Sequence, residues 1–243
     1  MPQQPIEAYY WPTPNGHKLT IALEEMGLPY VIKPVNIGAG DQFKPEFLAI
    51  SPNNRMPAII DPDGPDGKPI SVFESGAILQ YLARKTGKFH GTGERGRVEV
   101  EEWSFWQVGG LGPMVGQSQH FRFYAPVLVP DARMSVYGAN RYTNETHRLF
   151  GVMNKRLQGR DFLAGDYSIA DMLAWPWSTS HKKQGVQIED FPHVKGWLDR
   201  IAARPAVVRA LAQADKVKSV MAHDTSKEAE QARQTLFGQR ART

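Results

Sequence analysis

The chain has 243 residues, of which 41% are hydrophobic, a formal net charge of +4 and no cysteine. This length allows one large or two medium domains, and the lack of cysteine excludes disulfides, thiolate metal sites and a catalytic cysteine. Lysine and arginine are spread along the chain, which favours anionic small molecules over nucleic acid as partners. The seven histidines show no metal-ligand spacing, so we expect no metal. Long apolar runs and a secretory pattern are absent, so we expect no membrane span and a cytoplasmic location.

The first 35 residues predict a β-α-β unit. Residues 6–10 (IEAYY) are aromatic and branched, as is typical of a strand. Thr13 and Pro14 have the residue types of an N-cap and a first helical position, and Gly27 is a typical helix end. Residues 30–35 predict a second strand, and a right-handed crossover is expected between the two strands.

The next 50 residues predict the second half of the same domain. A glycine-rich stretch leads into a short helix at about 45–48. Pro57 is expected to open a strand, where its missing N–H group costs nothing. Turn residues separate this strand from another at 70–73, and a helix follows with Ser75 as its expected N-cap. Residues 6–87 therefore predict a thioredoxin-like α/β domain, a four-stranded sheet covered by helices.

The remainder predicts an all-α domain at residues 97–218, after a glycine-rich linker at 88–96. Ser168 and Asp171 form a capping-box pattern that opens one of its helices. Gly109 and Gly110 are expected to interrupt the first helix, and the tail at 219–243 is polar, able to form a helix but with little to bury. The other expected helices span residues 98–108, 131–157, 193–203 and 206–217.

Two short pieces of the first domain predict one binding site. The Met56-Pro57 bond lies in a tight turn where a cis peptide is accessible, which would let the backbone of Met56 pair with an extended peptide. The hydroxyl of Ser75 and the neighbouring N–H groups at the start of a helix form an anion site. Glu74 beside them can hold a cation. An acid next to a helix N-terminus suits the two charges of a zwitterionic α-amino acid group.

This combination resembles the glutathione-binding half of glutathione transferases, in which a cis-proline turn and a following Glu-Ser hold the tripeptide. A thioredoxin-like domain followed by an all-α domain is also the architecture of the cytosolic members. The resemblance covers nearly the whole chain except roughly the last 25 residues. It is close to the bacterial Nu class, which is associated with glutathione-dependent disulfide reduction, although Arg55 stands where that class commonly has lysine. The matching segments are PTPNGHK at 12–18, FKPEFLAISPNN at 43–54, FESGAILQYLA at 73–83, FWQVGGLGPMVGQ at 105–117, and YSIAD with WPW at 167–177.

The resemblance implies that Thr13 and Asn15 contact the sulfur of glutathione. A thiol with a pKa of about 8.5 is mostly protonated at neutral pH, so an enzyme must stabilise its thiolate. A hydroxyl and the N–H groups at a helix N-terminus both do so, and residues 13–15 supply them together. Other transferase classes use an N-terminal tyrosine instead. Tyr9 and Tyr10 are candidates, but strand alternation directs one of them into the core.

Further glutathione contacts are expected around the tripeptide. Gln42, Asn54 and Arg55 flank the expected position of the glycine carboxylate. Arg141, and with it Arg133, lies on the predicted long helix and is a candidate for contact with glutathione in a cleft or across a dimer. The predicted glutathione-binding set is Gln42, Asn54, Arg55, Met56, Pro57, Glu74, Ser75 and Arg141. His17, on the first helix, is expected to be a surface residue.

Three functions fit these residues. In the first, one glutathione thiolate attacks a disulfide and a second glutathione resolves the mixed disulfide, so the site binds two glutathiones or oxidised glutathione. In the second, the same thiolate is conjugated to an electrophile. In the third, the fold is a non-catalytic, glutathione-binding regulatory protein, which has no need for the sulfur-contacting residues. The family resemblance implies a homodimer in each case.

Overall fold

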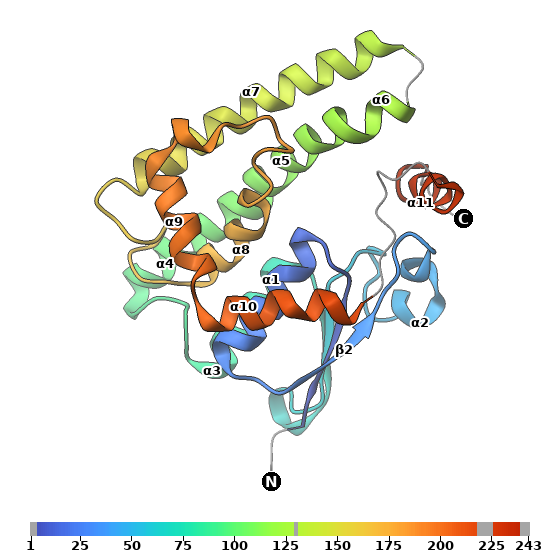
Figure 1. Cartoon of the computed structure of the whole chain (residues 1–243). Coiled ribbons are helices and arrows are strands. Elements are labelled where there is room, and N and C mark those ends of the chain that lie inside the picture. Colours follow the sequence, from blue (N-terminus) through green and yellow to red (C-terminus); the bar gives the residue numbers. More distant parts are fainter. Residues whose placement is uncertain (1–3, 129–130, 218–225, 239–243) are drawn as a thin grey trace. The chain divides into compact units, whose positions relative to one another are not determined.

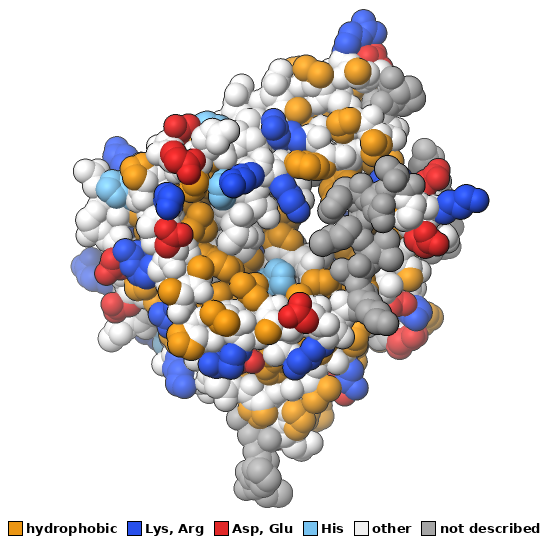
Figure 2. Space-filling view, in the orientation of Figure 1, with side chains coloured by type: hydrophobic (Ala, Val, Ile, Leu, Met, Phe, Trp, Pro, Cys, Tyr) orange, Lys and Arg blue, Asp and Glu red, His pale blue; other side chains and the backbone are white. Residues whose placement is uncertain are grey.

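The computed structural model describes residues 4–128, 131–217 and 226–238 (Figure 1). These residues form two compact units: those up to Leu79 together with those from Arg209 onward, and Gln80–Val208. The division falls inside α3 (Ser75–Thr86) and inside α10 (Pro205–Ala212). On the face drawn in Figure 2, basic and acidic side chains are interspersed rather than gathered in one patch. No described helix has the length and apolarity needed to cross a membrane.

The first unit contains a four-stranded sheet in the order β2-β1-β3-β4. The two parallel strands, β1 and β2, are joined by α1, as the β-α-β pattern predicts, and β3 and β4 are antiparallel neighbours. Ala58 of β3 lies opposite both Tyr9 and Phe73, so the turn before β3 and the residues after β4 come to the same end of the sheet. The elements are β1 (Ile6–Tyr10), α1 (Pro14–Met26), β2 (Tyr30–Pro34), η1 (Asp41–Phe43), α2 (Pro45–Leu48), β3 (Ala58–Asp61), η2 (Pro65–Gly67) and β4 (Ile70–Phe73).

Strand alternation decides which side of β1 is buried. Ile6, Ala8 and Tyr10 are fully buried, whereas Tyr9 lies on the other side and its hydroxyl donates to Glu7 at 3.0 Å. The expectation that one of the two tyrosines enters the core is therefore confirmed for Tyr10. Because its ring is buried, its pKa is raised, and it is poorly suited to give up a proton.

The second unit is helical, with one clear departure from the predicted pattern. Gly109 and Gly110 do not interrupt a helix, because the chain passes through them in π-helical form. A glycine weakens a helix by about 1 kcal/mol but keeps its N–H and C=O groups, so packing can hold the segment helical. The elements are α4 (Gly93–Trp106), the π-helical segments η3 (Gln107–Leu111) and η4 (His120–Tyr124), α5 (Gly112–Gln119), α6 (Ala125–Leu128), α7 (Ala132–Arg156), α8 (Ile169–Ser178), η5 (Ile188–Asp190) and α9 (Pro192–Ala202).

Two other expectations for this unit can be compared with the structure, one on where its first helix begins and one on the capping box at Ser168. The helix α4 begins at Gly93, inside the stretch 88–96 that the glycines predicted to be a linker. The capping box at Ser168 is confirmed, since the Asp171 carboxylate accepts from the Ser168 N–H group at 3.1 Å. Asp171 is fully buried and also accepts from the Leu163 N–H group at 3.0 Å, the Trp197 ring N–H group at 2.8 Å and the Ser168 hydroxyl at 3.3 Å. Burial raises the pKa of Asp171 to about 6, and these donors act in the opposite direction.

The end of the chain returns to the first unit through α10, η6 (Gln213–Lys216) and α11 (Lys227–Phe237). The tail forms the helix α11, as the sequence allows, and the buried residues of this helix are the two small side chains Ala229 and Ala232. A Cβ atom placed on Gly38 would lie 3.1 Å from the Cβ of Ala232, so the helix packs closely on that loop. Two alanines three positions apart make a small apolar face on an otherwise polar helix.

Candidate functional site

Three segments of the first unit meet at the N-terminal ends of α1 and α3. Side-chain hydrogen bonds connect them in a ring. The Thr13 hydroxyl donates to the sulfur of Met56 at 3.5 Å, and Asn53, in the same turn as Met56, donates to Glu74 at 3.3 Å. The Lys18 ammonium group, on α1, donates to the Ser75 hydroxyl at 3.4 Å and closes the ring. The bond between Asn53 and Glu74 brings the two predicted pieces of the site together, and the other two bonds connect α1 to each of them.

Thr13 is the N-cap of α1, as predicted. Its backbone is extended, and its hydroxyl oxygen accepts from the Gly16 N–H group at 3.2 Å. Gly16 is the residue that this geometry requires, because a side chain there would collide with the Trp11 carbonyl oxygen. The hydroxyl hydrogen of Thr13 points to a thioether, which is a weak acceptor. A thiolate arriving beside it is a stronger acceptor and can capture this hydrogen by a simple rotation of the hydroxyl.

The turn before β3 carries the predicted proline geometry. The Met56-Pro57 peptide is cis, as the sequence predicts, and Asn54 has a left-handed backbone with φ of 47°. The Ser51 hydroxyl donates to the Arg55 carbonyl oxygen at 2.8 Å and holds the turn in place. Within the described residues, the backbone N–H and C=O groups of Met56 form no hydrogen bond. An extended peptide lying alongside can therefore pair with them.

The β4–α3 junction differs by one residue from the prediction. The helix α3 begins at Ser75, so Ser75 is its first residue rather than its N-cap. Glu74 takes the cap position, since its carbonyl oxygen accepts from the Ile78 N–H group at 2.9 Å. Glu74 has a left-handed backbone with φ of 70°, a conformation that costs an L-residue roughly 1–2 kcal/mol. Nothing acidic follows in the first turn of α3, so the positive end of this helix has its acid only at Glu74.

Lys18 is a site residue that the sequence reasoning missed. It lies inside α1 and only 2% of its surface is exposed. Burial lowers the pKa of Lys18 to about 7, while the Glu74 carboxylate raises it. A signal was present in the sequence, because Lys18 shares the helical spacing of the apolar residues Leu19 and Ala22. A lysine on a core-facing stripe indicates that its ammonium group has a partner inside the fold.

His17 is not the surface residue that was expected. Its ring nitrogen Nδ1 lies 3.3 Å from the Tyr10 hydroxyl, and the two rings make an edge contact. Burial lowers the pKa of His17 to about 4, so the imidazole is neutral at physiological pH. The helix pattern misled because the face of α1 next to the apolar stripe packs on β1.

Three further predicted residues lie near the turn or in the loop that precedes it. Gln42 is 1% exposed, and its amide nitrogen donates to the Ile37 carbonyl oxygen at 3.1 Å. Its side-chain oxygen has no hydrogen-bond partner among the described residues. The structure thus places Gln42 inside the loop, and its contact with glutathione stays a prediction. Asn54 is half-buried and Arg55 is exposed, so their contacts with glutathione stay predictions.

Arg133 and Arg141 belong to the second unit, on α7. Arg133 is paired with Asp131, at 2.8 Å, at the start of the helix. Arg141 is exposed, and together with Arg148 it lowers the pKa of Glu145, Arg148 having the larger effect through its hydrogen bond. Their contact with glutathione stays a prediction.

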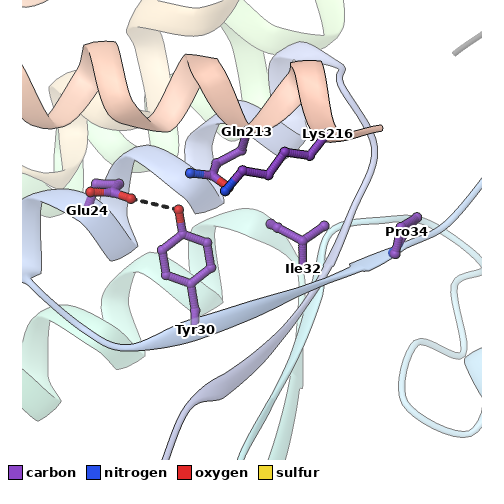
Figure 3. A pocket seen from close by; sticks show the side chains of 6 residues that line it. All are labelled: Glu24, Tyr30, Ile32, Pro34, Gln213 and Lys216. Atoms are coloured by element: carbon purple, nitrogen blue, oxygen red, sulfur yellow. Dashed lines mark hydrogen bonds between the residues drawn. The ribbon is translucent and has the colours of Figure 1, made fainter. Parts of the chain in front are cut away.

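A cavity of about 450 Å³ lies elsewhere in the first unit (Figure 3). None of the predicted site residues lines it. Figure 3 shows the hydrogen bond between the Tyr30 hydroxyl and Glu24 at one side and Lys216 beside Gln213 at the other. The candidate site is therefore an arrangement of helix ends and a turn, distinct from this cavity. In the described part of the chain, no group of three His, Asp or Glu side chains is placed to hold a metal ion.

Comparison with known proteins adds independent findings. The family model "Glutathione S-transferase, N-terminal domain" matches residues 4–84, and "Glutathione S-transferase, C-terminal domain" matches residues 139–205. The chain is 50% identical over 211 residues to the disulfide-bond oxidoreductase YfcG of Escherichia coli, covering 86% of this chain and 95% of that protein.

Two solved structures are also similar. One is a glutathione transferase from Burkholderia graminis with two glutathione molecules bound per subunit. Its identity is 45% and its TM-score 0.81, with 88% of this chain and 90% of that chain covered. The other is a glutathione transferase from Pseudomonas putida with one glutathione disulfide bound per subunit. Its identity is 41% and its TM-score 0.79, with 85% of this chain and 90% of that chain covered.

Proposed function

This chain belongs to the glutathione S-transferase family, and we propose that its reaction is the glutathione-dependent reduction of disulfide bonds. The observation that carries this proposal is the N-terminus of α1, where the Thr13 hydroxyl faces a thioether at 3.5 Å. A hydroxyl and a helix N-terminus stabilise a thiolate by hydrogen bonds and partial positive charge, without forming a covalent bond to it. The chain has no cysteine, so every thiol in the reaction comes from a small molecule. The similarity to a relative named as a disulfide-bond oxidoreductase supports this choice.

The proposed reaction has two balanced steps. The thiolate of a first glutathione attacks one sulfur of the substrate disulfide, forms a mixed disulfide and expels the other sulfur as a thiolate, which takes up a proton. A second glutathione thiolate then attacks the glutathione sulfur of the mixed disulfide. This step releases the second substrate thiol and leaves oxidised glutathione. Two electrons pass from two glutathiones to the substrate disulfide.

The residues of the ring have distinct proposed roles. The Met56 backbone pairs with the cysteinyl part of glutathione, as a strand would, and so fixes the sulfur near Thr13 and Asn15. Glu74 holds the α-ammonium group of the γ-glutamyl part, and Ser75 with the first N–H groups of α3 holds its α-carboxylate. Arg55 and Asn54, beside the turn, are proposed to meet the glycine carboxylate. Gln42 is proposed to support the loop that contains it, through its hydrogen bond to the Ile37 carbonyl oxygen.

A side-by-side steady-state assay tests the proposal. The enzyme is given glutathione with 2-hydroxyethyl disulfide in one arm and with 1-chloro-2,4-dinitrobenzene in the other, with uncatalysed rates subtracted. We expect kcat/KM for the disulfide to exceed that for the aryl halide by at least tenfold, about 1.4 kcal/mol of transition-state preference. A tenfold advantage for the aryl halide would instead support conjugation of glutathione to electrophiles.

Stoichiometry provides a second test. A site that resolves its own mixed disulfide must accommodate two glutathiones or one oxidised glutathione. Titration calorimetry with each ligand is expected to give two reduced or one oxidised glutathione per chain. The homodimer implied by the family resemblance is checked by light scattering under the same conditions.

A further inference from the structure

We propose that Lys18 is a positioning residue that sets the direction of the Ser75 hydroxyl, so that this hydroxyl donates to the carboxylate of the bound γ-glutamyl group. This inference rests on the proposed glutathione site. It concerns a residue with no role in the sequence-based predictions. Its basis is the hydrogen bond of 3.4 Å from the Lys18 ammonium group to the Ser75 oxygen, with both residues buried.

The direction follows from donor counting. An ammonium group has three N–H donors and no acceptor, whereas a hydroxyl has one hydrogen and two lone pairs. When protonated Lys18 donates to Ser75, the Ser75 oxygen is the acceptor and its hydrogen must point elsewhere. Ser75 is the first residue of α3, where the first N–H groups of the helix have no partner within the helix and can bind an anion. A hydroxyl hydrogen added to that set completes a group of donors for a carboxylate.

The proton on Lys18 decides whether this arrangement holds. A neutral amine carries a lone pair and accepts hydrogen bonds better than a hydroxyl does. Neutral Lys18 would therefore take the Ser75 hydrogen and turn it away from the ligand. Burial brings the pKa of Lys18 to about 7, so both forms are populated near neutral pH in the free protein.

Charged and titratable neighbours of Lys18 come from three elements. Glu74, at the β4–α3 junction, raises the pKa of Lys18. His17, the neighbour on α1, is neutral above its pKa of about 4, and Tyr10 of β1, bonded to His17, has a raised pKa. Neither His17 nor Tyr10 therefore changes its charge between pH 6 and 8. A ligand carboxylate at the start of α3 adds a negative charge, which favours protonated Lys18, so binding is coupled to proton uptake.

Calorimetry with S-methylglutathione tests this coupling, because the ligand lacks the thiol whose own proton release would obscure the signal. Titrations at pH 7 in buffers of different ionisation enthalpy give the number of protons taken up. For the wild type we expect about half a proton per ligand, since a pKa of about 7 leaves half of Lys18 neutral before binding. Affinity is expected to decrease above pH 7, by at most about tenfold per pH unit.

Lys18→Met and Lys33→Met form a matched pair. Methionine keeps much of the volume of lysine, and removal of a buried charge in favour of an apolar side chain is often tolerated. Lys18→Met should bind at least tenfold more weakly at pH 6 and should take up no proton. Lys33 lies exposed on β2, in an ion pair with Glu7 at 3.3 Å, so Lys33→Met should behave as the wild type.

Lys18→Arg separates charge from proton uptake. Arginine stays protonated, so this variant should bind without proton uptake and without the decrease above pH 7. Proton uptake that persists in Lys18→Met, or binding by the wild type with no uptake, would overturn the role of Lys18 while leaving the glutathione site intact. Failure of the wild type to bind S-methylglutathione at any pH would instead overturn the proposed glutathione function.

Discussion

The N-termini of α3 and α8 use the same residue types, a serine and an acid, but the acid is bonded differently in each. At α8, the Asp171 carboxylate is fully buried and accepts four hydrogen bonds from Leu163, Ser168 and Trp197. At α3, the Glu74 carboxylate accepts from the Asn53 side chain, and no acid follows in the first turn. One helix end is neutralised by the chain itself, and the other keeps donors for a ligand.

This difference separates the structural helix end at α8 from the proposed binding end at α3. The four donors around the Asp171 carboxylate offset part of the cost of burying it, and loss of the carboxylate leaves those donors unpaired. A helix end with a strained backbone at Glu74 and a buried lysine beneath it does not maximise stability by itself. We therefore expect substitutions at α8 to act on folding and substitutions at α3 to act on glutathione binding.

The largest expected effect is that of Asp171→Ala on stability. It removes the acceptor of four buried donors, so we expect the free energy of unfolding to drop by about 3 kcal/mol or more. The measurement is urea unfolding at pH 7.5, with Asp166→Ala, an exposed acid nearby, as the control. Glutathione affinity of the remaining folded protein should be unchanged. A small stability loss for Asp171→Ala would contradict its structural role.

The next effect is that of Ser75→Ala and Glu74→Gly on binding. Each removes a proposed charge-assisted hydrogen bond to glutathione, so affinity should weaken by roughly 1.5–3 kcal/mol, about tenfold to a hundredfold. Stability should change by less than about 1 kcal/mol in Glu74→Gly, because relief of the left-handed backbone offsets the added freedom of glycine. Glutathione titration and urea unfolding of the same samples measure both quantities. Ser71→Ala, an exposed serine in β4, is the control, and unchanged affinity in either variant would refute the assignment.

Thr13 combines the two kinds of helix end, so its variants sharpen the comparison. Thr13→Val removes both the cap of α1 and the donor near the sulfur, whereas Thr13→Ser keeps both. We expect Thr13→Val to lose about 1 kcal/mol of stability and about tenfold in kcat/KM for a disulfide, because the helix N-terminus itself remains. Asn15→Ala should cost more in turnover if its amide contacts the sulfur. Equal activity of Thr13→Val and Thr13→Ser would show that the hydroxyl is dispensable.

Local signals in the sequence predicted the parts of the site that depend on local geometry. Thr13 followed by Pro14 defines a helix start whatever lies around it, and Met56-Pro57 carries its turn within two residues. Such local signals could not predict contacts between side chains that are far apart in the sequence. The role proposed for Lys18 depends on its hydrogen bond to Ser75, which is 57 residues away in the sequence. The helical pattern alone shows only a charged residue on an apolar stripe.

Two features of the fold have the same origin. Gly109 and Gly110 are weak helix formers, yet the residues around them pack well enough to keep the segment helical. The alanines of α11 bury little area each, and their importance depends on Gly38, which leaves room for the helix to approach. In both cases the local sequence preference was judged correctly, but tertiary contacts determined the structure.

The smallest expected effect concerns a third helix end, at α11, where Ser226 is the cap and its hydroxyl accepts from the Ala229 N–H group at 3.2 Å. This bond is closer to solvent than those at α8, and no ligand role is proposed for it. Ser226→Ala should therefore destabilise α11 locally by about 0.5–1 kcal/mol and leave both global unfolding and glutathione binding unchanged. Hydrogen exchange of the amides at 229–237 measures the local change, with Ser226→Asp, which keeps a capping oxygen, as the control. Faster exchange in Ser226→Ala but not in Ser226→Asp would show that this cap stabilises α11 only locally, unlike Asp171, whose loss is expected to lower global stability. A loss of global stability as large as that of Asp171→Ala would mean that α11 is an integral part of the first unit.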